Sequence, residues 1–156
     1  ILGKALSGGM YPVSAVLAND EIMNVIQPGQ HGSTFGGNPI ACAVAVAALD
    51  VVEEEKLSER AEELGKLFRN EIEKLIEKTD LITKVRGKGL LNAILINDTP
   101  ESKTAWNLCL KLKENGLLAK PTHGNIIRLA PPLVITNQEL MDCVGIIEKT
   151  ILAFES

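Results

Sequence analysis

Lys4 is the first residue whose type and setting indicate chemistry. It ends an apolar stretch and is followed by Ser7-Gly8-Gly9, a turn too rich in glycine to pack tightly. A lysine ε-amine can act as a nucleophile. Because glycine lets a planar ligand approach the backbone closely, the segment suits imine formation with pyridoxal phosphate. A solvated lysine in a glycine turn is the alternative interpretation.

The segment 31–39 has a composition that is typical of phosphate binding. Ser33 and Thr34 are consecutive hydroxyl residues set among glycines, directly before an expected helix start. Their hydroxyl and backbone groups can donate hydrogen bonds to an anion, and a helix N-terminus adds positive dipole character. Asn38 is predicted to cap that helix, with Pro39 at its first position, so an ordinary polar turn is the alternative.

Arg128 is the third residue with a clear chemical signal. It stands in an otherwise apolar segment that runs into Ala130-Pro131-Pro132, and a short strand is predicted there. The planar guanidinium matches a carboxylate bidentately, so this arginine is expected to bind one. That carboxylate belongs either to a substrate or, in the alternative, to another residue of the protein in an internal salt bridge.

Together these segments resemble the class III aminotransferases, which are pyridoxal phosphate enzymes of fold type I. Three stretches, 3–16, 85–93 and 116–128, look like the branch of that family that acts on ornithine. The acetylornithine branch resembles the first and third of these stretches less well. The resemblance runs over nearly the whole chain, although the family's chains are much longer.

The resemblance implies a fold class and a domain organisation. The fold is expected to be α/β, of the aspartate aminotransferase-like type, with the end of the large cofactor-binding domain in residues 1–55. A connecting helix is expected in 56–80, and a carboxy-terminal small α+β domain in 81–156. We therefore interpret the chain as the carboxy-terminal part of an enzyme and expect it to be inactive in isolation.

The resemblance also assigns roles to the residues described above. Lys4 would be the catalytic residue, which binds pyridoxal phosphate covalently and then moves a proton between substrate and cofactor carbon atoms. Ser33 and Thr34 would bind the cofactor phosphate of the neighbouring subunit, which implies a homodimer with a shared active site. Arg128 would bind the α-carboxylate of glutamate or 2-oxoglutarate.

The implied reaction transfers the δ-amino group of L-ornithine to 2-oxoglutarate and yields glutamate 5-semialdehyde and glutamate. Such a reaction serves arginine catabolism and proline biosynthesis. One alternative keeps the chemistry and changes the substrate to acetylornithine or 4-aminobutyrate. Another is a non-catalytic carboxy-terminal module that binds no cofactor.

Other polar residues receive structural interpretations. His31 and His123 are far apart and each precedes a glycine in a turn, so structural hydrogen bonding is favoured over catalysis or metal binding. Arg86 and Lys88 could form an anion site, but a solvated hairpin tip is favoured. No metal site is expected.

Composition excludes several function classes. The net charge of -4, without a basic stripe, argues against nucleic-acid binding. The apolar run at 41–49 is short and closes with acidic residues, so no membrane span is expected. A cytoplasmic location is expected, with the mitochondrial matrix as the alternative. The three cysteines are widely spaced on apolar helical faces and are expected to be reduced core thiols: Cys42, Cys109 and Cys143.

Hydrophobic periodicity and breaker residues predict the elements that position these side chains. In chain order we expect a strand at 13–17, helices at 21–26, 39–54 and 58–78, a hairpin of strands 81–85 and 90–96, a helix at 99–114 capped by Thr99-Pro100, strands at 117–119 and 126–130, and a helix to 154 opened by a capping box at 136–139.

Overall fold

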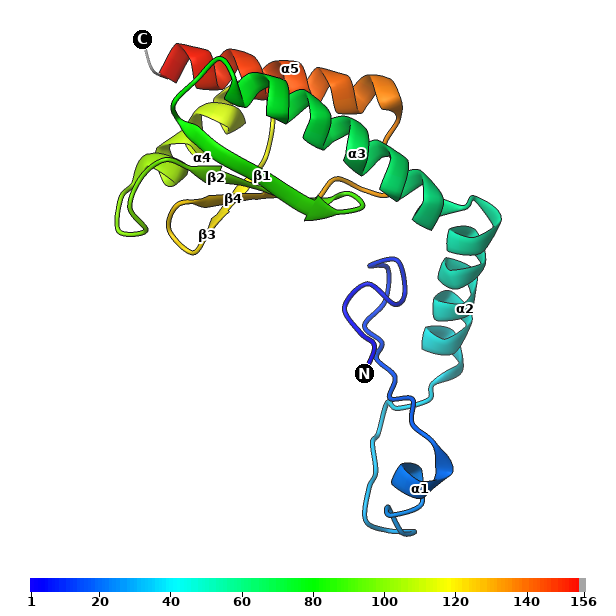
Figure 1. Cartoon of the computed structure of the whole chain (residues 1–156). Helices are drawn as coiled ribbons and strands as arrows, with labels where there is room; N and C mark the ends of the chain where they lie inside the picture. The colour runs from blue at the N-terminus through cyan, green and yellow to red at the C-terminus, as the bar shows by residue number, and fades with distance from the viewer. Residues whose placement is uncertain (155–156) are drawn as a thin grey trace. The chain divides into compact units, whose positions relative to one another are not determined.

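The computed structural model describes residues 1–154, and the chain divides into two compact units, Ile1–Lys56 and Leu57–Ser156. The first unit contains two helices, α1 (Asp20–Met23) and α2 (Pro39–Glu54), joined by long loops (Figure 1). The second unit contains a four-stranded sheet and the helices α3 (Leu57–Ile76), α4 (Thr104–Glu114) and α5 (Asn137–Phe154).

The predicted strand at 13–17 is wrong. Only an isolated bridge forms there, between Leu2 and Ala15, with backbone hydrogen bonds of 2.7 and 2.9 Å. A strand needs a neighbour along its length, because its backbone groups pair outside the segment. Within residues 1–154 this segment has a single bridge partner, Leu2, and so it remains an extended loop.

The start of α2 agrees with its predicted cap. The Asn38 side chain accepts a hydrogen bond from the backbone N–H of Ala41 at 2.9 Å, and Pro39 is the first helical residue. This side chain satisfies one of the donors that a helix N-terminus leaves unpaired. The helix buries only two of its side chains, Ala41 and Ala45.

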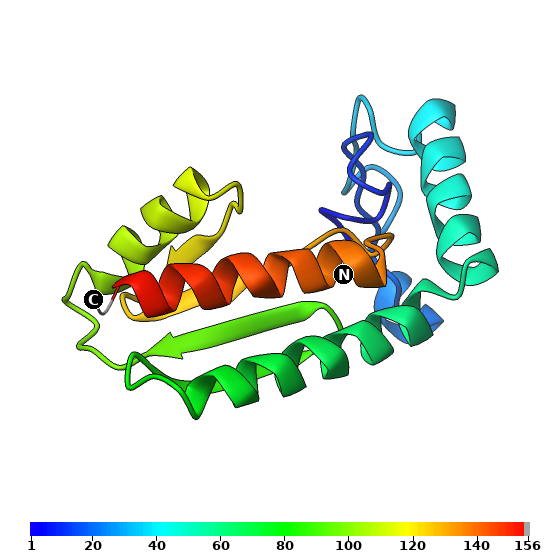
Figure 2. The same cartoon turned by 90° about the horizontal axis from the view of Figure 1, so that it is seen from above.

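The sheet of the second unit is antiparallel throughout, with the strand order β1-β2-β4-β3. Helix α3 packs on β1 and β2, and α4 packs on β3 and β4. Figure 2 shows α3 and α5 running side by side along the sheet. The strands are β1 (Ile82–Lys88), β2 (Leu91–Ile96), β3 (Lys120–Thr122) and β4 (Ile126–Leu129).

One face of the sheet carries the core. Val85, Ile94 and Ile127 form a cross-strand row, and all three are buried. Helix α3 meets this face with apolar residues spaced at three and four, the period of a helix face. The buried residues of α3 are Leu57, Ala61, Leu64, Gly65, Phe68, Ile72 and Leu75.

Helix α4 begins later than predicted. It starts at Thr104, because Asp98 holds the preceding residues in a turn. The Asp98 carboxylate accepts hydrogen bonds from the Thr99 N–H at 2.7 Å and from the Thr104 hydroxyl. Local bonds of this kind compete with helix formation. These bonds also lower the pKa of Asp98: the bond from Thr104 has the largest effect, and those from Thr99 and Ser102 have smaller ones.

The end of α4 agrees with prediction, but the strand after it does not. Gly116 has a positive φ of 93° and follows the cap residue, while the Leu117 N–H bonds back to the Leu112 carbonyl at 2.8 Å. This is the Schellman arrangement. Because it occupies Leu117, the strand predicted at 117–119 begins only at Lys120.

The predicted capping box opens α5. The Thr136 hydroxyl accepts from the Glu139 N–H at 3.2 Å, and the Glu139 carboxylate accepts from the Thr136 N–H at 2.8 Å. The two side chains thus satisfy each other's backbone donors. The backbone bond from Thr136, and then that from its hydroxyl, lower the pKa of Glu139.

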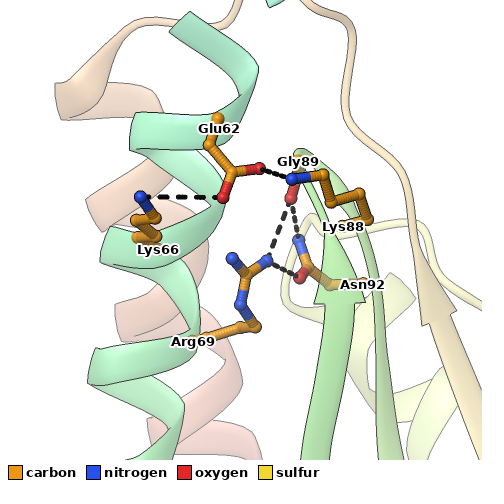
Figure 3. A network of polar contacts seen from close by, with 6 residues as sticks. All are labelled: Glu62, Lys66, Arg69, Lys88, Gly89 and Asn92. Carbon is orange, nitrogen blue, oxygen red and sulfur yellow. Dashed lines mark hydrogen bonds and ion pairs between the residues drawn. The ribbon is translucent and has the colours of Figure 1, made fainter. Parts of the chain in front are cut away.

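The hairpin of β1 and β2 is fastened to α3 at its tip (Figure 3). Arg69 donates to the Gly89 carbonyl at 3.2 Å and to the Asn92 side-chain oxygen at 2.8 Å. Lys88 forms an ion pair with Glu62 at 3.0 Å, and its hydrogen bond is the main cause of the lowered pKa of that carboxyl. We call this group the hairpin latch.

Helix and hairpin tip approach so closely because Gly65 has no side chain. A Cβ at Gly65 would lie 1.9 Å from the Gly89 carbonyl oxygen. The tip itself lies at Gly89, which has a φ of 53°, because β1 extends through Lys88. Lys88 is therefore the last strand residue before the tip, and its side chain is 89% exposed, as predicted for a solvated hairpin tip, although it also forms an ion pair.

Candidate functional site

Lys4 occupies a strained backbone position. Its φ is 60°, in the left-handed region that residues with a side chain seldom adopt. The Ala5 N–H bonds to the Gly3 carbonyl at 2.7 Å, which closes a three-residue turn around Lys4. Strained positions of this kind cluster at functional sites, where the surrounding structure holds them.

Ser7 holds the turn together, a role that the sequence reasoning missed. It is only 1% exposed. Its hydroxyl accepts from the Tyr11 N–H at 3.1 Å and donates to the Tyr11 carbonyl. The Gly8 N–H also bonds to the Ala5 carbonyl at 2.9 Å. A serine before two glycines was the available signal, because glycine turns need a local anchor to stay ordered.

The Lys4 turn borders a hollow of about 820 Å³ within the first unit. We call it the lysine hollow. Its walls come from the loop 4–15, from the segment 35–38 and from one side of α2. Its volume lies in the range of small-molecule sites. Among residues 1–154, no hydrogen-bond acceptor or carboxylate engages the Lys4 ammonium group.

Ser33 and Thr34 directly precede the segment 35–38 that lines this hollow, but they do not line it themselves. The Ser33 oxygen accepts from the Gly36 N–H at 2.9 Å, and a Cβ at Gly36 would lie 2.9 Å from the Ser33 Cβ. This serine turn therefore depends on glycine at 36. Thr34 is exposed, and its hydroxyl has no partner in the described part of the chain. It is free to donate to an external anion.

The residues of the first unit fit the lysine end of pyridoxal phosphate. An unengaged primary amine projects from a glycine-rich turn onto a hollow large enough for an aromatic ring. The Thr34 hydroxyl is available to a phosphate group. Thr34 itself does not line the lysine hollow, although the next residue, Phe35, does.

Arg128 lies on β4 in the second unit, where its side chain is exposed. It lines a hollow of about 320 Å³ with Arg86, Lys88 and His123, among others. We call it the arginine hollow. Within residues 1–154, Arg128 has no ion-pair partner. An internal salt bridge is therefore not formed with any carboxylate that the structure describes.

The two histidines do not form the hydrogen bonds that were predicted for them. His31 is exposed, and His123 has a positive φ of 50° in the turn between β3 and β4. Neither imidazole bonds to a residue in the range 1–154. Within the same range, no group of three or more His, Cys, Asp or Glu side chains could hold a metal ion.

The three cysteines are free thiols in unequal surroundings. Burial raises the pKa of Cys109 to about 11, and burial is also the main cause of the raised pKa of Cys143. Cys42 is exposed, so the prediction of a core thiol is wrong there. Cys42 instead lines the lysine hollow together with Ala41 and Ala45. None of the described helices is both long and apolar enough to cross a membrane.

Comparison with known proteins identifies relatives of this chain. The family model described as aminotransferase class-III matches residues 1–151. The mitochondrial ornithine aminotransferase of Rattus norvegicus is 61% identical over 99% of this chain, and that of Drosophila melanogaster is 62% identical over 98%. The chain spans about a third of the length of these curated relatives, 34% in both cases.

Solved structures show the same fold. A crystal structure of acetylornithine aminotransferase from Elizabethkingia anophelis is 87% identical, with a TM-score of 0.94, over 98% of this chain and 40% of its own. A Plasmodium falciparum ornithine δ-aminotransferase is 49% identical, with a TM-score of 0.91, over 99% of this chain and 39% of its own. The expected α/β architecture, part of pyridoxal phosphate fold type I, is thereby confirmed.

Proposed function

This chain belongs to the class-III aminotransferase family, and from that premise we propose that its protein is an ornithine aminotransferase. It would transfer the δ-amino group of L-ornithine to 2-oxoglutarate and release glutamate 5-semialdehyde and glutamate. Curated relatives from animals and fungi carry that name at 54 to 63% identity. The observation that carries the proposal is the unengaged Lys4 amine on the lysine hollow.

Lys4 is the catalytic residue in this proposal. Bound pyridoxal phosphate supplies an electron sink that stabilises the carbanion formed at the substrate carbon. The Lys4 amine holds the cofactor and, once displaced by the substrate amine, carries the proton between two carbon atoms. The strained turn, closed by the bond from the Ala5 N–H to the Gly3 carbonyl and followed by the Ser7 anchor, restricts the direction of this amine. A group that both accepts and donates the proton must be held in a fixed orientation toward the two carbon atoms.

Ser33 and Thr34 bind phosphate in this proposal. The Thr34 hydroxyl is free, and neither residue lines the hollow of the Lys4 amine. These two facts support a phosphate held by the neighbouring subunit's half of the site, and hence a homodimer with a shared active site. A chain without that partner would have an incomplete cofactor site.

Arg128 binds the α-carboxylate of 2-oxoglutarate or glutamate in this proposal. Its exposed guanidinium has no internal partner among residues 1–154, so its hydrogen-bond donors are available. Bidentate geometry favours a planar carboxylate over other anions. We assign residues 1–55 to the large domain, 56–80 to a connecting helix and 81–156 to the small α+β domain.

We also propose the cellular setting from the relatives. The rat and fruit-fly relatives are named as mitochondrial. For this chain we retain the cytoplasm as the proposed location, with the mitochondrial matrix as the alternative. The reaction proposed above belongs to arginine catabolism and proline biosynthesis.

Acetylornithine is the second candidate substrate, and one observation favours it. The Elizabethkingia anophelis structure, at 87% identity, is described as an acetylornithine aminotransferase. The two substrates differ at the α-nitrogen, which carries a positive charge in ornithine and a neutral acetyl group in acetylornithine. Initial rates of the intact enzyme with ornithine, acetylornithine and 4-aminobutyrate, each with 2-oxoglutarate, decide between these substrates.

Covalent capture tests the cofactor assignment. The intact enzyme is incubated with pyridoxal phosphate, reduced with borohydride and digested, and the modified peptide is identified by mass spectrometry. We expect the label on Lys4. A label on another lysine, or none, would contradict the proposal and favour a non-catalytic module.

A further inference from the structure

The loop that carries Lys4 has two limbs, residues 2–7 and residues 11–15. At the base of the loop, Leu2 and Ala15 pair through two backbone hydrogen bonds of 2.7 and 2.9 Å. These bonds join the start of the first limb to the end of the second. The backbone is therefore fixed two residues before Lys4.

The other end of the loop is fixed by a single hydroxyl group. The Ser7 hydroxyl accepts a hydrogen bond from the Tyr11 N–H at 3.1 Å and donates one to the Tyr11 carbonyl. Among residues 1–154, the Tyr11 backbone forms no other hydrogen bond. A hydroxyl can form both bonds because it carries a donor and acceptors on one atom. We call this pair of bonds the serine clasp.

The serine clasp is shielded from water. Ser7 is the only buried residue in the range 1–15. Hydrogen bonds at a buried group are stronger than those at an exposed group, because water does not compete for the donor and the acceptor. The clasp is therefore a firm second attachment point for the loop.

Lys4 lies between these two attachment points in a strained conformation. Its φ of 60° is unfavourable for a residue with a side chain. A strained backbone persists only where the structure around it holds it in place. The pairing of Leu2 with Ala15 holds one side, and the serine clasp holds the other. Loss of the clasp would let the turn relax and would redirect the Lys4 side chain.

Both limbs of the loop line the lysine hollow. Lys4 and Leu6 come from the first limb, and residues 12–15 come from the second. The wall formed by 12–15 begins directly after Tyr11, the residue that the clasp holds. The clasp therefore also fixes the position of this wall relative to Lys4. Ser7 itself does not line the hollow.

We propose that Ser7 is a positioning residue for Lys4, because the serine clasp fixes the direction of the Lys4 side chain toward the lysine hollow. This inference rests on the proposed function, in which the Lys4 amine is the reacting group. A misplacement of about 1 Å can slow a reaction about a hundredfold. Loss of the clasp should thus slow the chemical steps more than it weakens substrate binding.

Amide hydrogen exchange tests the clasp itself. The intact enzyme is depleted of cofactor, and exchange is followed by mass spectrometry of overlapping peptides that cover residues 5–15. In Ser7→Ala the Tyr11 amide should exchange at least about tenfold faster than in the wild type, because its acceptor is gone. This measurement requires neither cofactor nor turnover.

Kinetics and spectroscopy of the cofactor-loaded enzyme test the effect on Lys4. In Ser7→Ala we expect kcat with ornithine to fall roughly tenfold to a hundredfold and KM to change less than about threefold. Visible circular dichroism per bound cofactor, which reports the orientation of the cofactor ring, should change as well. Ser7→Cys keeps nearly the same shape with a weaker hydrogen-bonding group, so its kcat should be intermediate. That variant also tests the proposal if Ser7→Ala does not fold.

Thr150→Val is the matched control. Thr150 on α5 is also buried, and its hydroxyl likewise forms one donated and one accepted bond. It donates to the Ile146 carbonyl at 2.6 Å and accepts from the Asn115 side chain at 2.8 Å. Thr150 lines neither the lysine hollow nor the arginine hollow. The variant should lower Tm to a similar extent as Ser7→Ala, but it should change kcat less than about twofold.

Three results would overturn the proposal. Unchanged exchange of the Tyr11 amide in Ser7→Ala would exclude the clasp. Faster exchange with unchanged kcat and unchanged visible circular dichroism would show that Lys4 does not depend on it. An equal fall of kcat in Thr150→Val would reduce the effect to general stability. Borohydride labelling of Lys4 in the wild type is measured separately, so failure of the proposed function is distinguished from failure of this inference.

Discussion

Gly65→Ala tests how closely the hairpin tip must approach α3. The Gly89 carbonyl oxygen lies 1.9 Å from the position of the new Cβ, whereas ordinary contact begins at 3.4 Å. The helix and the tip must therefore separate by about 1.5 Å. Backbone atoms meet there, so no flexible side chain can yield. The latch bonds from Arg69 to Gly89 and from Lys88 to Glu62 would stretch or break.

The expected magnitude follows from opposing contributions. Alanine in place of glycine inside a helix stabilises by about 1 kcal/mol. Forced overpacking costs about 1 to 3 kcal/mol. Each hydrogen bond lost at the latch costs about 0.5 to 1.5 kcal/mol. With two bonds lost, the net effect is destabilisation by roughly 1 to 5 kcal/mol.

Gly145→Ala provides the control for helix propensity. Gly145 lies inside α5, and a Cβ built there meets nothing within 4 Å. It should stabilise the protein by up to about 1 kcal/mol. Urea denaturation of the intact enzyme, followed by circular dichroism, gives both free energies of unfolding. Hydrogen exchange of the β1 and β2 amides shows whether the loss is local to the hairpin. Equal stability of the two variants would refute the close approach.

Four further predictions concern the proposed site and the α5 cap. Lys4→Ala should reduce turnover by several orders of magnitude and abolish the borohydride label, while size-exclusion chromatography still shows a folded dimer. Thr34→Ala should weaken cofactor retention by roughly tenfold to a hundredfold and change kcat little; an unchanged cofactor Kd would contradict the phosphate role. Arg128→Lys should raise the activation free energy of the 2-oxoglutarate half-reaction by about 2 to 5 kcal/mol, measured by single-turnover absorbance, and that of the ornithine half-reaction much less. Equal slowing of both half-reactions would indicate a structural role. The pKa of Glu139 is lowered in the folded state, so the ionised carboxylate contributes fully to folding stability above its ordinary pKa of 4.5. This contribution is lost as the pH falls through the pKa of the folded state. Glu139→Gln should therefore reduce Tm near neutral pH more than at acidic pH.

Local capping chemistry was predictable from sequence. The Asn38 cap, the Thr136 capping box and the Gly116 helix end all agree with the structure. In each case the donor and acceptor lie within five residues of one another, so the pattern of residue types is sufficient. The approximate extents of α2, α3 and α5 follow likewise from periodicity over one chain segment.

Predictions failed where a distant or competing group decides. The strand at 13–17 lacks a partner along its length, and the Asp98 carboxylate delays the start of α4. Exposure of Cys42 depends on which side of α2 is covered. These outcomes depend on which other groups compete for the same backbone atoms or surface, and residue types along one segment do not specify that.

The sequence alone determined the candidate chemistry of this protein. A lysine before a glycine turn, paired hydroxyls before a helix and an arginine in an apolar strand are recognisable because each side chain brings its own reactivity. Tertiary structure alone decided which of them meet. Strand register places Arg86 and Arg128 on either side of Ala93, and the absence of a side chain at Gly65 lets the hairpin tip approach α3, where Lys88 pairs with Glu62. Register and close packing are set by contacts between segments far apart in the chain, and only folding creates those contacts.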